Sequence, residues 1–225
     1  MLKVLDGLGG WAPRLVAVDA EGSRFGEPAI LITKLSGHSD VMPKSVDAAA
    51  TQLGHALARI HATPLATLGG LRDGFAAATS GTPSGPAAEV VAAHGHHLAD
   101  QEPVLTHYDF WSGNALWEDG RLTGIVDWSG ASRAPRGFDV SWCRLDLVLL
   151  HGAHAAEVFL TAYEEAAGVA VPDVALWDLF ALQNSHESVE TWLPNYTDLG
   201  RTDLTTTDLR ERHTAWTEEC LSSAR

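Results

Sequence analysis

The sequence is poor in cysteine and has no long apolar run. Its two cysteines, Cys143 and Cys220, have no metal-ligand spacing. Because free cysteine is commonly buried and disulfides are rare in reducing compartments, we interpret Cys143 as a small core residue. No apolar stretch approaches the length that spans a bilayer, and residues 1–6 reach an acid before a signal-peptide core could form. We therefore expect a cytoplasmic protein without a membrane partner.

Positive charge is also scarce. Lysine and arginine total 15 against 29 aspartates and glutamates, so the net charge is −14. Nucleic-acid binding needs a basic footprint, and this composition argues against it. The negative charge could serve solubility alone, or it could steer a cationic substrate towards the protein.

The remaining pattern predicts an α+β fold that is mostly helical. Residues 15–18 and 29–35 have the apolar, β-branched character of a strand pair, and residues 118–121 have the character of a hairpin turn between two later strands. The Gly-, Ser- and Pro-rich stretch 69–86 is predicted as a mobile loop that can hold one short helical turn. The other predicted strands cover 103–106, 115–117 and 122–126, and the predicted helices cover 45–62, 87–100, 140–150, 155–167, 174–190 and 208–221.

The most informative segment is HYDFWSGN, residues 107–114. It fits H-x-D-x-x-x-x-N, the catalytic-loop pattern of kinases, in which Asp109 would orient an acceptor hydroxyl and take its proton. Asp127 follows the predicted strand 122–126 directly, where kinases place a metal-binding aspartate. Asn114 and Asp127 would supply the oxygen ligands that Mg²⁺ prefers, and we expect Mg²⁺ to bind only with a nucleotide that adds further oxygens. The alternative is a polar hairpin with Asp and Asn in its turns.

The histidines also admit two interpretations. His107 could be a catalytic base or a metal ligand, but we favour a structural role in which its ring bonds backbone groups of the loop. His94, His96 and His97 lie near the end of a predicted helix. They could form a zinc site, although we favour a solvated cluster that compensates the helix dipole.

These motifs resemble the aminoglycoside phosphotransferase and choline-kinase-like families, whose fold is related to the protein kinases. Residues 13–18 look like the strand that enters the hinge, 30–37 like the hinge strand, and 57–62 like the helix that ends in Leu-His. The resemblance implies a protein-kinase-like C-lobe with a catalytic β-hairpin over residues 37–225. It also implies that residues 1–36 are a remnant of an N-terminal β-lobe and hinge.

The same resemblance implies roles for individual residues. The protein would use ATP or GTP with Mg²⁺ and would phosphorylate a hydroxyl of a small molecule. Backbone groups of Thr33, Lys34 and Leu35 would meet the base of the nucleotide. The carboxylate of Asp139 would hold the catalytic-loop backbone and take no part in the chemistry.

The acceptor cannot be named from the sequence, but its surroundings can be predicted. Glu187 and Glu190 are close in sequence, and Trp192 could offer an aromatic face nearby. We predict that these three residues line the acceptor site, where the carboxylates would suit a cationic acceptor. The alternative is a solvated helix face.

The sequence also departs from the family. A family member normally begins with a β-lobe that carries a phosphate-covering loop and a strand lysine paired with a helix glutamate. Here residues 2–8 look like the tail of that helix, Lys3 stands too early to be the strand lysine, and 134–137 match the family only loosely. A natural fragment, a mis-assigned start or a degraded member would each account for this. We expect weak or no turnover from the chain alone, and self-association through exposed edges of the strands near Leu15 and Ile30.

Two other functions compete with an active kinase. A non-catalytic module of kinase descent could bind a nucleotide or small molecule in the same cleft, and the missing β-lobe favours it. A metal-dependent hydrolase could use the same acids, but no further His or Asp cluster supports it. The intact Asp109, Asn114 and Asp127 favour the kinase.

Overall fold

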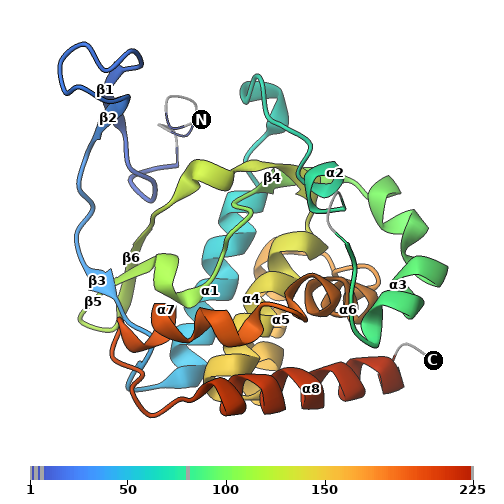
Figure 1. Cartoon of the computed structure of the whole chain (residues 1–225). Helices are drawn as coiled ribbons and strands as arrows, with labels where there is room; N and C mark the ends of the chain where they lie inside the picture. The colour runs from blue at the N-terminus through green and yellow to red at the C-terminus, as the bar shows by residue number, and fades with distance from the viewer. Residues whose placement is uncertain (1, 3–4, 6–7, 80–81, 224–225) are drawn as a thin grey trace.

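The structure is a computed structural model that describes residues 2, 5, 8–79 and 82–223. Its elements confirm an α+β fold that is mostly helical with small antiparallel sheets (Figure 1). Of the segment 2–8 only residues 2, 5 and 8 are described, so the expected helix tail and Lys3 lie outside the described residues. Within the described part of the chain, no helix is both long and apolar enough to cross a bilayer.

Helix α1 (Val46–His61) forms one wall of the core. It begins at Ser45, whose hydroxyl accepts the N–H of Ala48 at 3.3 Å. One face of the helix is buried and packs against α5 (Ala153–Ala167). The two helices approach closely at Gly54, where a Cβ atom would lie 2.6 Å from the carbonyl oxygen of Phe159. Glycine at this position is therefore required by the packing.

The C-terminal helices complete the helical body. Helices α4 and α5 pack together, and α4, α6 and α8 contact one another (Figure 1). The long helices are α4 (Gly137–His151), α6 (Val174–Ser185) and α8 (Thr206–Ser223), and the short ones are α2 (Gly74–Ala78), α3 (Ala87–His94) and α7 (Leu193–Thr197). Short 3₁₀ helices cover Leu65–Thr67, Gly95–Asp100, Ser112–Asn114, Trp128–Gly130 and Val189–Trp192.

Three small antiparallel sheets accompany the helices. The first pairs β1 (Leu15–Asp19) with β2 (Ala29–Ile32). The other two sheets carry the segments on either side of the catalytic motif. They consist of β3 (His38–Ser39), β5 (Ala115–Glu118) and β6 (Arg121–Ile125) in the order β3-β5-β6, and of β4 (Pro103–Thr106) paired with β7 (Ser132–Pro135).

Several predicted boundaries were wrong. Strand β2 ends at Ile32 and not at residue 35. Further pairing would place it opposite Pro13, which precedes β1 and has no N–H to continue the ladder. Helix α6 ends at Ser185, whose hydroxyl donates to the Ala181 carbonyl and also bonds His213. The predicted helix 87–100 changes to a 3₁₀ helix at residue 95. Helix α2 is the short helical turn expected within the stretch 69–86, and β7 was not predicted.

The β1–β2 hairpin stands away from the helical body (Figure 1). It exposes large apolar side chains, among them Val16, Val18, Ile30 and Leu31, each between 57% and 59% exposed. In the described part of the chain, the outer edges of β1 and β2 pair with no third strand. Open edges with apolar side chains are a template for pairing with another chain.

We predict that this hairpin drives self-association. Val18 and Ile30 face each other across the sheet, so Val18→Lys with Ile30→Glu replaces an apolar pair by an ion pair without changing the net charge. In sedimentation equilibrium at a protein concentration of about 50 µM, the double variant should have a lower weight-average mass than the wild type. Val169→Lys, which alters an exposed apolar side chain elsewhere, should not change the mass. Equal masses for the double variant and the wild type would contradict the prediction.

Candidate active site

The β5–β6 hairpin brings Asn114 and Asp127 together. Ala115 pairs with Ile125, and one step further the Asn114 carbonyl accepts the N–H of Val126 at 2.9 Å. Asp127 comes next and adopts a left-handed conformation with φ 59°. Its carboxylate is exposed and accepts the Ser129 hydroxyl at 2.7 Å. Antiparallel pairing thus places two residues that are far apart in sequence at one end of the hairpin.

The side chain of Asn114 also orients Asp109. Its Nδ2 donates to the Asp109 carbonyl at 2.9 Å and to Asp109 Oδ2 at 3.2 Å. Because both partners are acceptors, the amide nitrogen must face them, and the Asn114 Oδ1 atom is left for another ligand. The second carboxylate oxygen of Asp109, Oδ1, accepts the indole N–H of Trp142 at 3.2 Å.

Two clefts meet at Asp109. The smaller has a volume of about 220 Å³, and the larger about 600 Å³. Asp109 and Trp142 line both. The smaller cleft brings together the three residues predicted for phosphoryl transfer, and its lining consists of Asp109, Trp111, Asn114, Asp127, Trp142, Asp146, Trp192, Asn195 and Tyr196.

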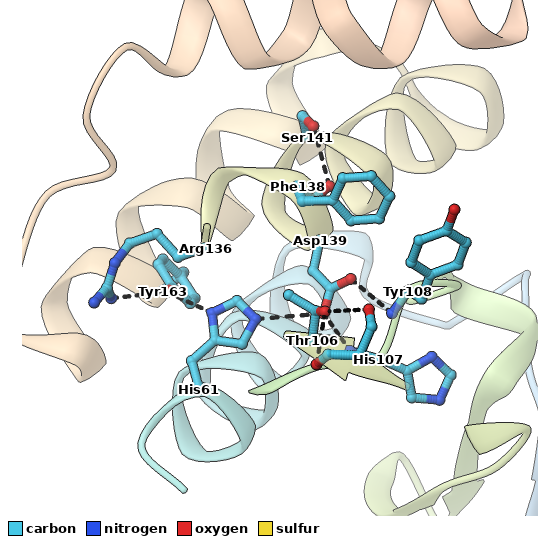
Figure 2. A network of polar contacts seen from close by, with 10 residues as sticks. His61, Thr106, His107, Tyr108, Arg136, Phe138, Asp139, Ser141 and Tyr163 are labelled. Atoms are coloured by element: carbon cyan, nitrogen blue, oxygen red, sulfur yellow. Dashed lines mark hydrogen bonds and ion pairs between the residues drawn. The ribbon is translucent and has the colours of Figure 1, made fainter. Parts of the chain in front are cut away.

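The carboxylate of Asp139 holds the backbone of the segment 107–114 (Figure 2). This carboxylate is fully buried at the start of α4, and its Oδ2 accepts the N–H of His107 at 2.6 Å. Its Oδ1 accepts the N–H of Tyr108 at 2.9 Å. Tyr108 has φ 78°, a strained value for a bulky residue, so the bond to its N–H stabilises a conformation that the loop would otherwise avoid.

A chain of buried polar groups supports Asp139 in turn (Figure 2). Arg136 donates to the Tyr163 hydroxyl at 3.1 Å, and that hydroxyl lies 2.7 Å from His61 Nδ1. His61 Nε2 lies 3.4 Å from Asp139 Oδ2. Burial lowers the pKa of His61 and raises that of Tyr163 to about 12, so both are neutral at pH 7. The Tyr163 hydroxyl therefore donates to His61, and the His61 Nε2–H donates to Asp139.

His107 connects the catalytic loop to the segment before Asp127. Its Nε2 donates to the Val126 carbonyl at 2.9 Å, and its ring packs against Trp128. Burial lowers the pKa of His107, which favours the neutral ring. Within the described residues its Nδ1 atom has no hydrogen-bond partner. The ring is thus placed to support the loop, and it is not among the residues that line either cleft.

Sequence reasoning missed a second buried carboxylate, Asp146. Its Oδ2 accepts the N–H of Ser112 at 3.0 Å and the Ser112 hydroxyl at 2.6 Å, and its Oδ1 accepts the Tyr196 hydroxyl at 3.1 Å. Burial raises the pKa of Asp146 to about 6. An acid within the most apolar stretch of the sequence was the signal that could have identified it.

The predicted hinge residues follow β2 and lead to β3. The N–H of Thr33 donates to the Arg14 carbonyl at 2.9 Å, so it is already engaged. In the described part of the chain, no hydrogen bond occupies the backbone of Lys34 or Leu35. The segment is fastened to the β5–β6 hairpin by the Thr123 hydroxyl, which donates to the Ser36 carbonyl at 2.7 Å.

The three predicted acceptor residues are separated in the structure. Glu187 lines the larger cleft and Trp192 the smaller. Glu190 lines neither, because Arg210 binds both of its carboxylate oxygens at 2.6 Å and holds its pKa at about 2. We therefore leave Glu190 out of the proposed acceptor site.

The described residues contain no group of three or more His, Cys, Asp or Glu side chains that could hold a metal ion. In the His-rich segment, His97 bonds Asp173 at 3.1 Å and its side chain is 43% exposed. His96 packs edge-on against the same ring. This arrangement is that of a solvated pair at the end of α3.

The mostly helical body with small antiparallel sheets matches the fold of kinase-like phosphotransferases. The sequence profile of the phosphotransferase enzyme family (APH) matches residues 1–177, and the chain belongs to that family. No curated protein matches the chain.

Solved structures agree with this assignment at low sequence identity. A choline/ethanolamine kinase family protein from Mesorhizobium loti superposes with a TM-score of 0.63 at 15% identity, covering 100% of this chain and 80% of its own. Aminoglycoside phosphotransferase APH(3'')-Id from Streptomyces rimosus, in complex with ADP and streptomycin, gives 0.61 at 15% identity over 82% and 79%. The GDP complex of aminoglycoside 2'-phosphotransferase-IIIa gives 0.56 at 17% identity over 100% and 80%. These likenesses show the fold.

The buried position of Asp139 predicts a large effect on stability. Asp139→Asn would place an amide N–H against a backbone N–H and remove the charge that strengthens both loop bonds. We expect the free energy of unfolding to fall by about 3 kcal/mol in urea titration. Asp127→Asn is the matched control: that carboxylate is exposed, and asparagine tolerates a left-handed backbone, so the change should stay within about 0.5 kcal/mol. Equal effects of the two variants would contradict the assignment.

The raised pKa of Asp146 predicts a pH dependence of stability. Between pH 3.8 and about 6 the folded protein keeps a proton on Asp146 that the unfolded chain has lost, so stability falls as pH rises through this window. Asp146→Asn cannot titrate. Relative to this variant, the wild type should lose about 2 kcal/mol of unfolding free energy from pH 4 to pH 7. Urea titrations of both proteins across the window measure the difference, and a constant difference would refute the prediction.

Proposed function

We propose that the chain transfers the γ-phosphoryl group of ATP or GTP to a hydroxyl of a small molecule, with the weak turnover expected of this chain alone. The observation that supports this best is the convergence of Asp109, Asn114 and Asp127 on one cleft. In the proposed reaction the acceptor oxygen bonds to the γ-phosphorus while the bond from that phosphorus to the bridging oxygen breaks. The nucleoside diphosphate leaves with the electron pair, and the hydroxyl proton passes to the carboxylate of Asp109.

The residues at the end of the β5–β6 hairpin fit Mg²⁺. Asn114 Oδ1 and the exposed Asp127 carboxylate are hard oxygen donors, which is the chemistry this ion prefers. When bound, Mg²⁺ would neutralise charge on the transferred phosphoryl group. Because the described residues offer no cluster of three acids or histidines, the protein alone supplies too few ligands for a closed cage. Metal binding that depends on the nucleotide follows from this donor set.

The nucleotide base is proposed to lie against residues 33–35. The backbone groups of Lys34 and Leu35 have no partner among the described residues, whereas the N–H of Thr33 is engaged by Arg14. The base would therefore meet Lys34 and Leu35 in preference to the Thr33 N–H. Structures of similar fold hold ADP and GDP, which supports either purine nucleotide.

The acceptor is proposed to be a small hydroxyl compound that reaches Asp109 through one of the two clefts. Among the described residues, no lysine or arginine lines either cleft, and Glu187 and Trp192 contribute a carboxylate and an aromatic ring. This lining suits a cation. The structures of similar fold include an aminoglycoside phosphotransferase in complex with streptomycin and a choline/ethanolamine kinase family protein.

The competing proposal is a non-catalytic module that binds a nucleotide or small molecule. An intact Asp109, held by two donors, favours catalysis. The two proposals differ in one result, because only a catalyst forms a nucleoside diphosphate in step with a phosphorylated acceptor.

The test is phosphotransfer by purified protein with ATP or GTP and Mg²⁺, using streptomycin, choline and ethanolamine as acceptors. Asp109→Asn should lower the transfer rate by about 10²–10⁴-fold while nucleotide affinity in calorimetry stays unchanged, because the lost group acts on the proton. Asp119→Asn, an exposed turn residue of the β5–β6 hairpin, should behave as the wild type. Nucleotide binding without transfer to any acceptor would favour the non-catalytic module.

A further inference from the structure

We infer that Trp142 is a positioning residue that fixes the carboxylate of Asp109, an inference that rests on the proposed function. Its indole N–H donates to Asp109 Oδ1 at 3.2 Å, while Asn114 Nδ2 donates to Oδ2 at the same distance. Each carboxylate oxygen thus accepts one bond from a separate element. Rotation of the carboxylate about its Cβ–Cγ bond would break both, so the two donors together hold one orientation.

The position of Trp142 on α4 gives this contact its meaning. Asp139, Trp142 and Asp146 are three and four residues apart, and such residues share one face of a helix. Each of them bonds a successive point of the catalytic loop. Asp139 holds the backbone before Asp109, Trp142 holds Asp109 itself, and Asp146 holds Ser112 beyond it.

The indole ring is itself fixed. It packs against Trp192, with ring centroids 5.4 Å apart and an interplanar angle of 58°. It lines both clefts together with Asp109, so it stands at the border between them. A donor on a packed ring costs little reorganisation when it orients a reacting group, which is the requirement for a precise site.

The contact leaves Asp109 able to act. A carboxylate oxygen can accept two hydrogen bonds, so each oxygen that already holds one donor can still accept an acceptor hydroxyl. Trp142 can therefore bond the proposed base without blocking the bond between that base and the substrate hydroxyl. The alternative is that Trp142 only fills space beside Trp192, in which case its N–H has no consequence.

Trp142→Phe separates these possibilities, because it keeps an aromatic ring beside Trp192 and removes the indole N–H together with the pyrrole ring. We expect kcat for phosphotransfer to fall about tenfold while the nucleotide KM stays unchanged, since misorientation affects the reacting group alone. In an Asp109→Asn background, adding Trp142→Phe should cause no further loss. Trp177→Phe is the matched control: it removes an indole bond of 3.0 Å to Gln101, outside both clefts, and should leave kcat unchanged.

A second measurement needs no activity. The Trp142 indole N–H resonance, assigned by its absence in Trp142→Phe, should shift in Asp109→Asn and should not shift in Asp119→Asn. The inference would be overturned if Trp142→Phe had the kcat of the wild type, or if it caused an equal loss of kcat in the Asp109→Asn background. It would also be overturned if Asp109→Asn did not shift the indole resonance. If the wild type transfers no phosphate, the proposed function fails, and the resonance alone then decides whether Trp142 holds Asp109.

Discussion

The buried carboxylate of Asp139 is the constraint on which the site depends. It accepts two successive backbone N–H groups of the catalytic loop, His107 and Tyr108, in a fully buried position. Charged acceptors make the stronger hydrogen bonds, and buried donors cannot turn to water instead. The strained backbone at Tyr108 can therefore persist, and this backbone conformation sets the direction of the Asp109 side chain that follows it. The neutral His61 behind Asp139 donates to the carboxylate without neutralising it, and the Tyr163 hydroxyl in turn bonds His61.

The site is consequently a property of α4 as much as of the loop. A loop of eight residues has many accessible conformations, and ordering it costs conformational entropy. Helix α4 is rigid, and its face presents an acceptor, a donor and an acceptor at fixed spacing through Asp139, Trp142 and Asp146. The β5–β6 hairpin adds the second anchor, since the Asn114 carbonyl and the His107 ring both bond Val126. Loop, helix and hairpin thus fix one another.

The sequence was informative where function and local structure coincide. The H-x-D-x-x-x-x-N motif and the strand before Asp127 are contiguous, and a hairpin has one natural pairing, so their meeting at one cleft could be predicted. The contacts of Trp142, Asp146 and Tyr196 could not be, because they depend on how α4 and α7 pack against the loop. Glu190 was predicted for the acceptor site for the same reason. Its partner Arg210 lies 20 residues further along the chain, and the sequence near Glu190 does not show that Arg210 binds its carboxylate. A helical spacing of Asp139, Trp142 and Asp146 was present in the sequence, but it gains meaning only when the partner of that helix face is known.

Three arginine side chains bind partners in the C-terminal half of the chain and do not line the two clefts. Arg144 is buried against Asp178, Arg210 binds Glu190, and Arg201 bonds Asp203 and the Leu150 carbonyl. These side chains serve the packing of the C-terminal helices. Among the described residues that line the two clefts there is no lysine or arginine, whereas carboxylates are present in both. The carboxylates would repel a nucleoside triphosphate that entered such a cleft without a counterion. A cation bound to the triphosphate would therefore have to neutralise part of its charge. The oxygen donors of Asn114 and Asp127 are suited to share that cation, and the nucleotide and the metal ion would then bind as one unit.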